Sequence, residues 1–382
     1  MLKQIITALA LTLAGCSAAG QEPIAPALAP EAGGWVELAP QPIEIDGRRF
    51  EPTCSDAPGA ESAFRFWARR GASNRLVVFF DGGGACWDDV TCAVPRLAEH
   101  GREGDGFYKA ELLPGDDPRT MSGIFDLDNP RNPVRDWSFV FVPYCTGDVH
   151  AGSNTQRYTD PDTGETFAIQ HRGADNFRIV LEWMRANFDA PEAIAVTGSS
   201  AGAYGAVTHY AAIRAAFPTG RALMLGDAGQ GVTPGDFIGR RNANWNYQLP
   251  ASVFGDRDQI TAEDDLVARL AAHYPDDRFA QYTTAHDITQ VAFYAFMGAS
   301  NACAAWTERM RADLATRQRS TSNFRAYLAN NDTHTILRSR LFYTERSGGT
   351  PFAEWMGALL EEDAPANAAC RNCARRAARC PY

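Results

Sequence analysis

Short runs of apolar residues, each followed by a turn of glycine, aspartate or serine, recur along the chain. The runs are nearly continuous rather than alternating, which is typical of strands buried on both faces of a sheet. Helical patterns lie between them, at 176–188 and 203–217. This alternation predicts an α/β protein with a mostly parallel central sheet flanked by helices. The predicted strands, with their turns, are 75–84, 137–145, 193–200, 222–231, 279–284 and 324–334.

The 382 residues fit a single large α/β unit. The sequence contains no internal repeat, and we find no second domain in it. We therefore expect one folded domain over 35–382, with a cap-like insertion at 235–285.

The first residues have the pattern of an export signal. Lys3 gives a positive start, and an apolar run too short to span a bilayer follows it. Leu-Ala-Gly-Cys at 13–16 resembles a bacterial lipobox, which predicts a signal peptide over 1–15 and a lipid on Cys16. Residues 16–34, rich in proline and ending in Gly33-Gly34, predict a flexible tether. We expect an exported protein anchored by lipid to a bacterial membrane; the alternative is an ordinary secretory peptide and a secreted protein.

Charge and cysteine content narrow the class of protein further. The formal net charge is −10, and the basic run at 371–379 is too short to form a nucleic-acid surface, so we expect no nucleic-acid partner. Apart from Cys16, eight cysteines remain, an even number that indicates disulfides in an exported chain. Cys86 with Cys92 is the first expected pair, and a disulfide-linked tail at 370–380 is favoured over a zinc site. We expect no metal, no cofactor and a monomer.

The first candidate for a catalytic motif is Gly198-Ser199-Ser200-Ala201-Gly202, where an apolar predicted strand meets a predicted helix of small residues. This is the G-x-S-x-G pattern of a nucleophile elbow, which places a serine on a strained turn. A serine hydroxyl needs a base that is oriented by a third group. Ser200 is therefore the candidate nucleophile, and Ser199 is the variable residue before it.

Two acid–base pairs follow Ser200 in the required order of serine, acid and histidine. Asp287 with His334 places both groups after the last two predicted strands. Asp227 with His286 is the alternative. The strand positions favour the first pair, which leaves Asp227 as a structural group that bonds loop amides. Among the other histidines, His209 is expected to pack in the elbow helix, His150 to be near the pocket, and His100 and His171 to lie at the surface.

Acyl transfer also needs donors for a developing oxyanion. In a nucleophile-elbow enzyme one donor is the amide after the nucleophile, here Ala201, and another comes from a glycine-rich loop after an early strand. Gly82-Gly83-Gly84 follows the strand predicted at 75–80. We expect the amides of Gly83 and Gly84 to complete the oxyanion hole.

Several segments taken together carry a family resemblance: FDGGGACW, VPYCTGDVHAGS, TGSSAGAYG, GDAG and the segments around Asp287 and His334. The chain resembles the pectin acetylesterase/Notum family in this combination. Its members are extracellular α/β-hydrolases that remove O-acyl groups, acetate from pectin in plants and palmitoleate from a signalling protein in Notum. The resemblance implies an α/β-hydrolase fold, with Ser200 as nucleophile, Asp287 as acid and His334 as base. It also implies Gly83, Gly84 and Ala201 as the oxyanion hole.

The resulting hypothesis is a serine carboxylesterase that cleaves O-acyl esters, acetyl esters of a polysaccharide such as pectin above all. The alternatives on the same triad are an amidase or peptidase and a lipase-like deacylase of longer chains. A binding protein on a hydrolase scaffold is the non-catalytic alternative.

Overall fold

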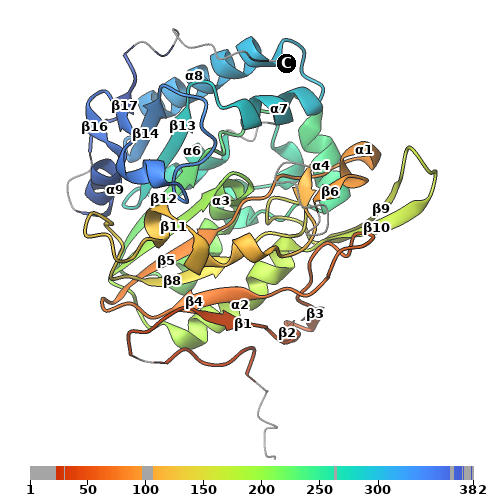
Figure 1. The fold of residues 1–382 in the computed structure, drawn as a ribbon, viewed down its shortest axis with the longest axis horizontal. Coiled ribbons are helices and arrows are strands. Elements are labelled where there is room, and N and C mark those ends of the chain that lie inside the picture. Colours follow the sequence, from red (N-terminus) through yellow and green to blue (C-terminus); the bar gives the residue numbers. More distant parts are fainter. Residues whose placement is uncertain are drawn as a thin grey trace, which may run out of the picture.

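The computed structural model describes residues 23–29, 31–96, 106–261, 265–361, 365–371, 373 and 380. Within these residues a nine-stranded sheet runs through the molecule (Figure 1), in the order β1-β4-β8-β5-β11-β12-β13-β14-β17. Only the pairs β1–β4 and β4–β8 are antiparallel, so the predicted mostly parallel sheet is confirmed. The strands are β1 (Val36–Leu38), β4 (Phe66–Arg69), β8 (Ser138–Val142), β5 (Arg75–Phe80), β11 (Ala193–Ser199), β12 (Arg221–Asp227), β13 (Arg278–Thr284), β14 (Phe324–Ala329) and β17 (Ala368–Ala369).

The apolar runs form central strands because both faces of the sheet are covered. In β5, Val78 belongs to one buried cluster and its neighbours Val77 and Phe79 belong to the cluster on the opposite face. Since successive strand residues point to opposite faces, a strand between two apolar layers has no polar side. All seven residues of β11 are buried for the same reason.

Helices cover the two faces unequally. Residues of α2, α3, α6 and α8 build the cluster on one face, whereas α9 and the 3₁₀ helix η4 pack on the other. The α-helices are α1 (Asp89–Cys92), α2 (Gly173–Asn187), α3 (Ala201–Ala216), α4 (Phe237–Trp245), α5 (Ala251–Phe254), α6 (Asp265–His273), α7 (Ile288–Phe296), α8 (Ala302–Ser320) and α9 (Phe352–Leu360). The 3₁₀ helices are η2 (Pro114–Asp116), η3 (Pro118–Thr120), η4 (Gly123–Phe125), η5 (Arg257–Gln259) and η6 (Arg340–Tyr343).

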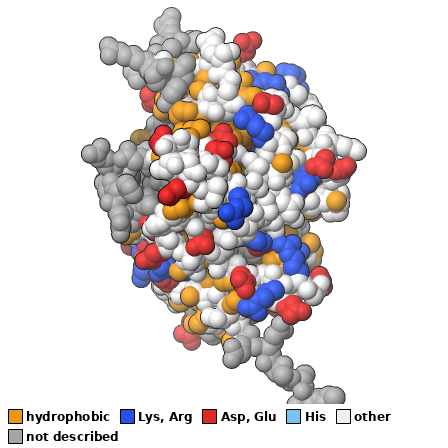
Figure 2. All heavy atoms as spheres, turned by 90° about the vertical axis from the view of Figure 1, so that its right-hand side faces the viewer, with side chains coloured by type: hydrophobic (Ala, Val, Ile, Leu, Met, Phe, Trp, Pro, Cys, Tyr) orange, Lys and Arg blue, Asp and Glu red, His pale blue; other side chains and the backbone are white. Residues whose placement is uncertain are grey.

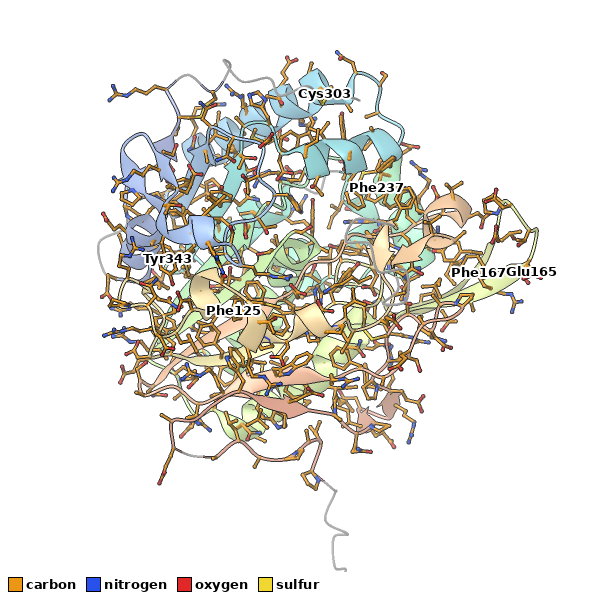
Figure 3. All side chains as sticks on the ribbon, viewed as in Figure 1. Phe125, Glu165, Phe167, Phe237, Cys303 and Tyr343 are labelled. Atoms are coloured by element: carbon orange, nitrogen blue, oxygen red, sulfur yellow. A yellow bond between two sulfur atoms is a disulfide. The ribbon has the colours of Figure 1, made fainter. Side chains whose placement is uncertain are left out.

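In the described part of the chain, short pairs of strands also form small two-stranded sheets outside the central sheet. The longest, β9 with β10, is a hairpin that projects from the body and carries Glu165 and Phe167 near its outer end (Figure 3). The pairs are β2 (Ile43–Ile45) with β3 (Arg48–Phe50), β6 (Pro95–Arg96) with β7 (Tyr108–Lys109), β9 (Asn154–Thr159) with β10 (Thr166–His171), and β15 (Arg346–Ser347) with β16 (Thr350–Pro351). On the face that bears this hairpin, acidic and basic side chains are interspersed (Figure 2).

The structure corrects three expectations. The stretch 235–285 is not one insertion, because its last part is β13 of the central sheet and α6 packs into the main core. Residues 23–29 do not form a free tether: Ala25 and Leu28 are buried, and Leu28 N donates to Asn187 Oδ1 at 2.8 Å. His171 is fully buried rather than at the surface. His100, Cys16 and the predicted signal peptide lie outside the described residues.

Four disulfides link the described cysteines. Cys86–Cys92 was expected from the sequence and is present. The tail is linked as predicted, by Cys370–Cys373 and by Cys303–Cys380, which fastens the end of the chain to α8. Cys54–Cys145 joins segments 91 residues apart in sequence. Among the helices that the structure describes, none combines the length and apolar character of a membrane span.

Candidate active site

Ser200 lies at the sharp turn between β11 and α3, with φ 58° and ψ −124°. A positive φ is unfavourable for a residue with a side chain and indicates a position held by its surroundings. The turn is held by a hydrogen bond from Ser200 N to Asp227 O, at 2.8 Å. Gly198 and Gly202 allow it because a Cβ on either would overlap backbone atoms of the elbow or of β5. The structure therefore contains the strained strand-to-helix turn that the sequence predicts, and the role of Ser200 as nucleophile stays a prediction.

Ser200, His334 and Asp287 form a continuous chain of hydrogen bonds. His334 Nε2 lies 2.8 Å from Ser200 Oγ, and His334 Nδ1 lies 2.9 Å from Asp287 Oδ2. Asp287 follows β13 and caps α7, and His334 lies in the loop after β14, so adjacent parallel strands bring the two together. With Nδ1 protonated towards the carboxylate, Nε2 is left to accept the serine proton. This is the geometry of an activated serine nucleophile.

The surroundings of His334 favour its protonated form. Burial lowers the pKa of His334, but the carboxylates of Asp287 and, more weakly, Asp227 raise it by more, so it lies above the ordinary value of 6.5. Asp287 is fully buried and also accepts hydrogen bonds from Gln290 N at 3.0 Å and Gln290 Nε2 at 2.9 Å. These contacts fix the position of the carboxyl group beside the imidazole.

The alternative pair, Asp227 with His286, is not brought together. His286 Nε2 lies 2.7 Å from Cys373 O. Asp227 Oδ2 accepts from Ser199 Oγ at 2.6 Å and from Leu337 N at 2.9 Å. Burial raises the pKa of Asp227 to about 6 despite these hydrogen bonds. Asp227 thus bonds loop amides, as predicted, and Ser199 has a structural contact that the sequence did not reveal.

The glycine loop lies directly against the elbow. A Cβ on Gly82 would be 2.5 Å from Ser199 O and 2.8 Å from Ser200 Cβ. Gly84 has φ 78° and forms an antiparallel bridge with Tyr108. The bridge consists of two hydrogen bonds: Ala85 N donates to Phe107 O, and Lys109 N donates to Gly83 O. Since the two bonds flank Gly84, this pairing leaves the Gly84 amide outside the ladder.

A cavity of about 70 Å³ opens beside Ser200. Gly84 and Ala201 line it with Ser200 and His334, whereas Gly83 is not among its lining residues and packs against Lys109 and Tyr144. The remaining walls are mostly apolar and come from α3, α4, α7 and α8; they include Tyr204, Phe237, Arg241, Trp245, Phe293, Met297 and Trp306. Phe237, the first residue of α4, is labelled in Figure 3. An apolar chamber of this kind suits the acyl part of an ester.

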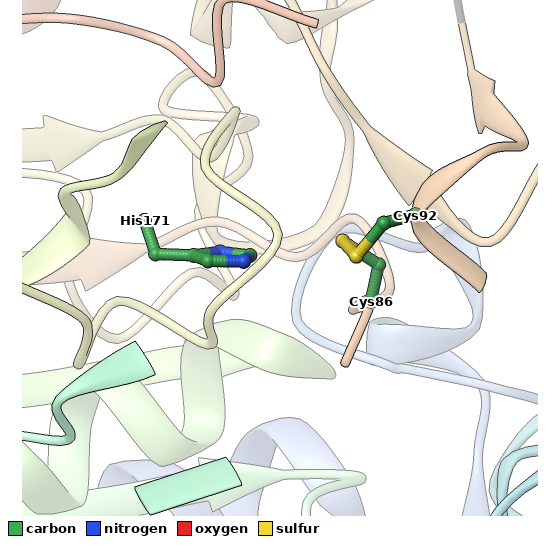
Figure 4. A group of neighbouring side chains, drawn as sticks. All are labelled: Cys86, Cys92 and His171. Atoms are coloured by element: carbon green, nitrogen blue, oxygen red, sulfur yellow. A yellow bond between two sulfur atoms is a disulfide. The ribbon is translucent and has the colours of Figure 1, made fainter. Parts of the chain in front are cut away.

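Within the described residues, Cys86, Cys92 and His171 form a group with the composition of a metal site (Figure 4). The two sulfur atoms are joined as a disulfide and are therefore not thiolates, the form that binds metals. His171 Nε2 lies 2.9 Å from Tyr158 Oη, and Nδ1 lies 2.9 Å from Thr146 O. In the oxidised protein the three residues form a structural contact rather than a ligand set.

Comparison with known proteins assigns the family. The family model described as Pectinacetylesterase matches residues 49–293. The chain belongs to the pectinacetylesterase family. It is 28% identical over 209 residues to pectin acetylesterase 11 of Arabidopsis thaliana, an alignment that covers 53% of this chain and 49% of that protein. It is 25% identical over 136 residues to palmitoleoyl-protein carboxylesterase NOTUM of Schmidtea mediterranea, covering 35% of this chain and 23% of the relative.

The chain thus aligns with half or less of the length of these two relatives. Two crystal forms of the Wnt deacylase Notum from Drosophila share its fold, with TM-scores of 0.54 and 0.56 at 17% identity. They cover 83% and 81% of this chain, and 95% and 89% of the solved chains. The α/β-hydrolase fold expected for this family member is confirmed.

Several residues at the site escaped the sequence analysis. Lys109 and Arg338 both pair with Asp81, beside the glycine loop, and Lys109 also pairs with Asp116. Arg241 and Trp306 line the cavity from helices with no recognisable motif. The only sequence signal for the charged group is Asp81 itself, an acidic residue at the end of an apolar strand.

Proposed function

We propose that this protein is a serine carboxylesterase that hydrolyses O-acyl esters. The observation that carries the proposal is the hydrogen-bonded chain of Ser200, His334 and Asp287, which opens into an apolar cavity in a member of the pectinacetylesterase family. The Asp287 carboxylate holds the Nδ1–H of His334, so that Nε2 is aimed at the serine hydroxyl. No metal or cofactor is part of the proposed reaction.

In the proposed reaction His334 Nε2 takes the proton of Ser200 as Oγ attacks the ester carbonyl. The amides of Gly84 and Ala201, with that of Gly83, donate to the oxyanion of the tetrahedral intermediate. The intermediate collapses when the C–O bond to the alcohol breaks and protonated His334 gives its proton to the departing oxygen. Water, deprotonated by His334, then attacks the acyl-enzyme, and the acid leaves as the proton returns to Ser200 Oγ.

We propose short acyl groups, acetyl above all, on a polysaccharide alcohol such as pectin. The name of the Arabidopsis relative supports this substrate class. The name of the planarian relative supports the alternative of a long, palmitoleoyl-type chain. A series of p-nitrophenyl esters from acetyl to palmitoyl separates the two, because kcat/KM should be highest at two to four carbons for the first and at long chains for the second.

The test of the reaction itself is hydrolysis of p-nitrophenyl acetate by the purified protein. Ser200→Ala and His334→Ala should each lower kcat by roughly 10⁴-fold or more. His286→Ala is the matched control, since His286 is bonded to Cys373 O, away from Ser200, and should keep its activity. Absence of both turnover and fluorophosphonate labelling in the wild type would favour the binding-protein alternative. Faster cleavage of anilides than of esters would favour an amidase.

We also propose that the protein is exported and that Cys16 carries a lipid anchor. The support is the lipobox-like sequence together with the disulfides, which fit an exported protein. Mass spectrometry of the mature N-terminus tests this proposal. A Cys16→Ser variant that stays in the membrane fraction would refute it.

A further inference from the structure

A group of buried charges lies at the base of the glycine loop. Asp81 follows β5 directly, is fully buried, and has Gly82 as its neighbour. Lys109 Nζ lies 2.8 Å from Asp81 Oδ2 and 2.5 Å from Asp116 Oδ1. The guanidinium of Arg338 pairs with the other oxygen, Asp81 Oδ1. Burial raises the pKa of Asp81, but Arg338 and Lys109 lower it by more, so the carboxylate stays charged.

Asp81 and Lys109 hold the glycine loop on the side opposite the elbow. Lys109 N donates to Gly83 O at 2.8 Å, and a Cβ on Gly83 would lie 2.6 Å from Lys109 Cε. On its other side the loop lies against Ser199 and Ser200, as described for Gly82. His150 Nε2 lies 2.8 Å from the backbone oxygen of Asp81. The loop is therefore confined on both sides, and its position follows that of Asp81.

Arg338 connects this group to the loop that carries His334. It lies four residues after His334, and the amides of Ile336 and Leu337 between them donate to Asp227. One ion pair thus joins the end of β5 to the segment after β14, which are separated in the sheet by β11, β12 and β13. The glycine loop and His334 are the parts of the site that must keep a fixed distance from Ser200.

We propose that Arg338 is a positioning residue, which through Asp81 holds the amides of the glycine loop at the distance from Ser200 and His334 that oxyanion binding requires. The inference rests on the proposed esterase function. It follows from the contacts because the guanidinium of Arg338 joins the residue before the glycine loop to the loop that carries His334. The Asp81 carboxylate is fully buried, so loss of the partly exposed Arg338 leaves Lys109 as its remaining ion-pair partner and changes the balance of contacts that holds it.

The experiment compares Arg338→Gln and Arg338→Lys with Arg340→Gln, an exposed arginine two residues further on. With p-nitrophenyl acetate, Arg338→Gln should lower kcat by roughly 10- to 100-fold with little change in KM, because the lost contact acts on the transition state. Arg338→Lys keeps the charge without the planar fork and should recover part of the rate. Arg340→Gln should match the wild type.

A second readout separates positioning from general stability. Phenylboronic acid forms a tetrahedral adduct with an activated serine and needs the oxyanion donors, so its Kd should rise in Arg338→Gln by about the factor that kcat falls. A kcat and a boronate Kd within twofold of Arg340→Gln would overturn the inference, as would a loss of kcat with an unchanged boronate Kd. If Arg338→Gln does not fold, Arg338→Lys is judged by the same two measurements. Failure of the esterase proposal is distinct, because the wild type itself would then be inactive.

Discussion

Gly82 shows how close the glycine loop comes to the nucleophile. A methyl group there would meet Ser199 O and Ser200 Cβ, so Gly82→Ala has to push the loop away from the elbow. We predict a fall in kcat of roughly 100-fold or more, because a displacement of about 1 Å at a catalytic group has that effect. Steady-state kinetics with p-nitrophenyl acetate measures it. The control is Gly115→Ala, where a Cβ meets no atom within 4 Å and activity should be unchanged.

The pKa of His334 sets the second residue-scale prediction. His334 must be neutral to take the serine proton, and its pKa is raised above 6.5. Activity is therefore lost as the pH falls through a midpoint above 6.5, higher than for an unperturbed histidine. Asp287→Asn removes the main group that raises the pKa, so the midpoint should move down while the rate drops by roughly 10⁴-fold. The pH profile of kcat/KM checks both; a wild-type midpoint below 6.5 would contradict the assignment.

At the scale of elements, the sequence predicted best where local pattern and final environment agree. The buried strands β5, β8, β11, β12, β13 and β14 appear as nearly continuous apolar runs, and helices α2 and α3 lie where the helical patterns at 176–188 and 203–217 place them. The edge strand β1, its neighbour β4 and the hairpin β9–β10 were not predicted, because β1 and β4 are only three and four residues long and the hairpin is largely exposed or half-buried.

The residues of the candidate site likewise fall into those that the sequence predicted and those that it did not. Ser200, Asp287 and His334 were predicted because each follows a recognisable strand. The order serine, acid, histidine also left only two acid–histidine pairs to choose between. Lys109 and Arg338 were missed because an ion pair between distant segments has no sequence signature. Of the two glycines predicted as oxyanion donors, Gly84 lines the cavity and Gly83 packs against Lys109 and Tyr144, so the role of the Gly83 amide stays a prediction.

The disulfides give an element-scale prediction. Cys54–Cys145 spans 91 residues of sequence and Cys86–Cys92 only six. By loop entropy alone the first should stabilise the fold by roughly 4–5 kcal/mol and the second by about 2 kcal/mol. Denaturant unfolding of the two double-serine variants tests this order. An equal or larger loss for the Cys86–Cys92 variant would show that its contacts near the glycine loop matter more than chain entropy.

For the whole molecule, buried titratable groups predict how stability depends on pH. Burial lowers the pKa of His150 to about 4 and that of His171 and His209 to about 3. Burial raises the pKa of Asp148 and Asp227 to about 6. Between about pH 5 and 6.5 the unfolded chain therefore binds protons on three histidines that the folded protein leaves neutral, while the folded protein holds extra protons on the two carboxyls.

Near pH 5 the three histidines are almost fully protonated only in the unfolded chain, and together they outweigh the two aspartates and Glu345, whose pKa burial also raises. The free energy of unfolding should therefore increase as the pH rises from 5 to 6.5. The two aspartates oppose this increase, because the folded protein binds their protons more tightly than the unfolded chain does. His334 opposes it in the same way, since its pKa is raised in the folded protein. The free energy of unfolding therefore rises less steeply with pH than the three histidines alone would give. Urea unfolding at pH 5.0, 5.75 and 6.5 measures the trend. A decrease over this range would mean that the buried histidines have partners that stabilise their charged form.

The positive φ of Ser200 has a consequence for the evolution of the protein. A residue with a side chain held in that region costs roughly 1–3 kcal/mol, which the packing around the elbow has to offset. Selection for thermal stability alone would therefore replace this serine, and glycine would relieve the strain there. If Ser200 is the nucleophile, we expect homologues that no longer hydrolyse esters to carry glycine or another residue at the position of Ser200.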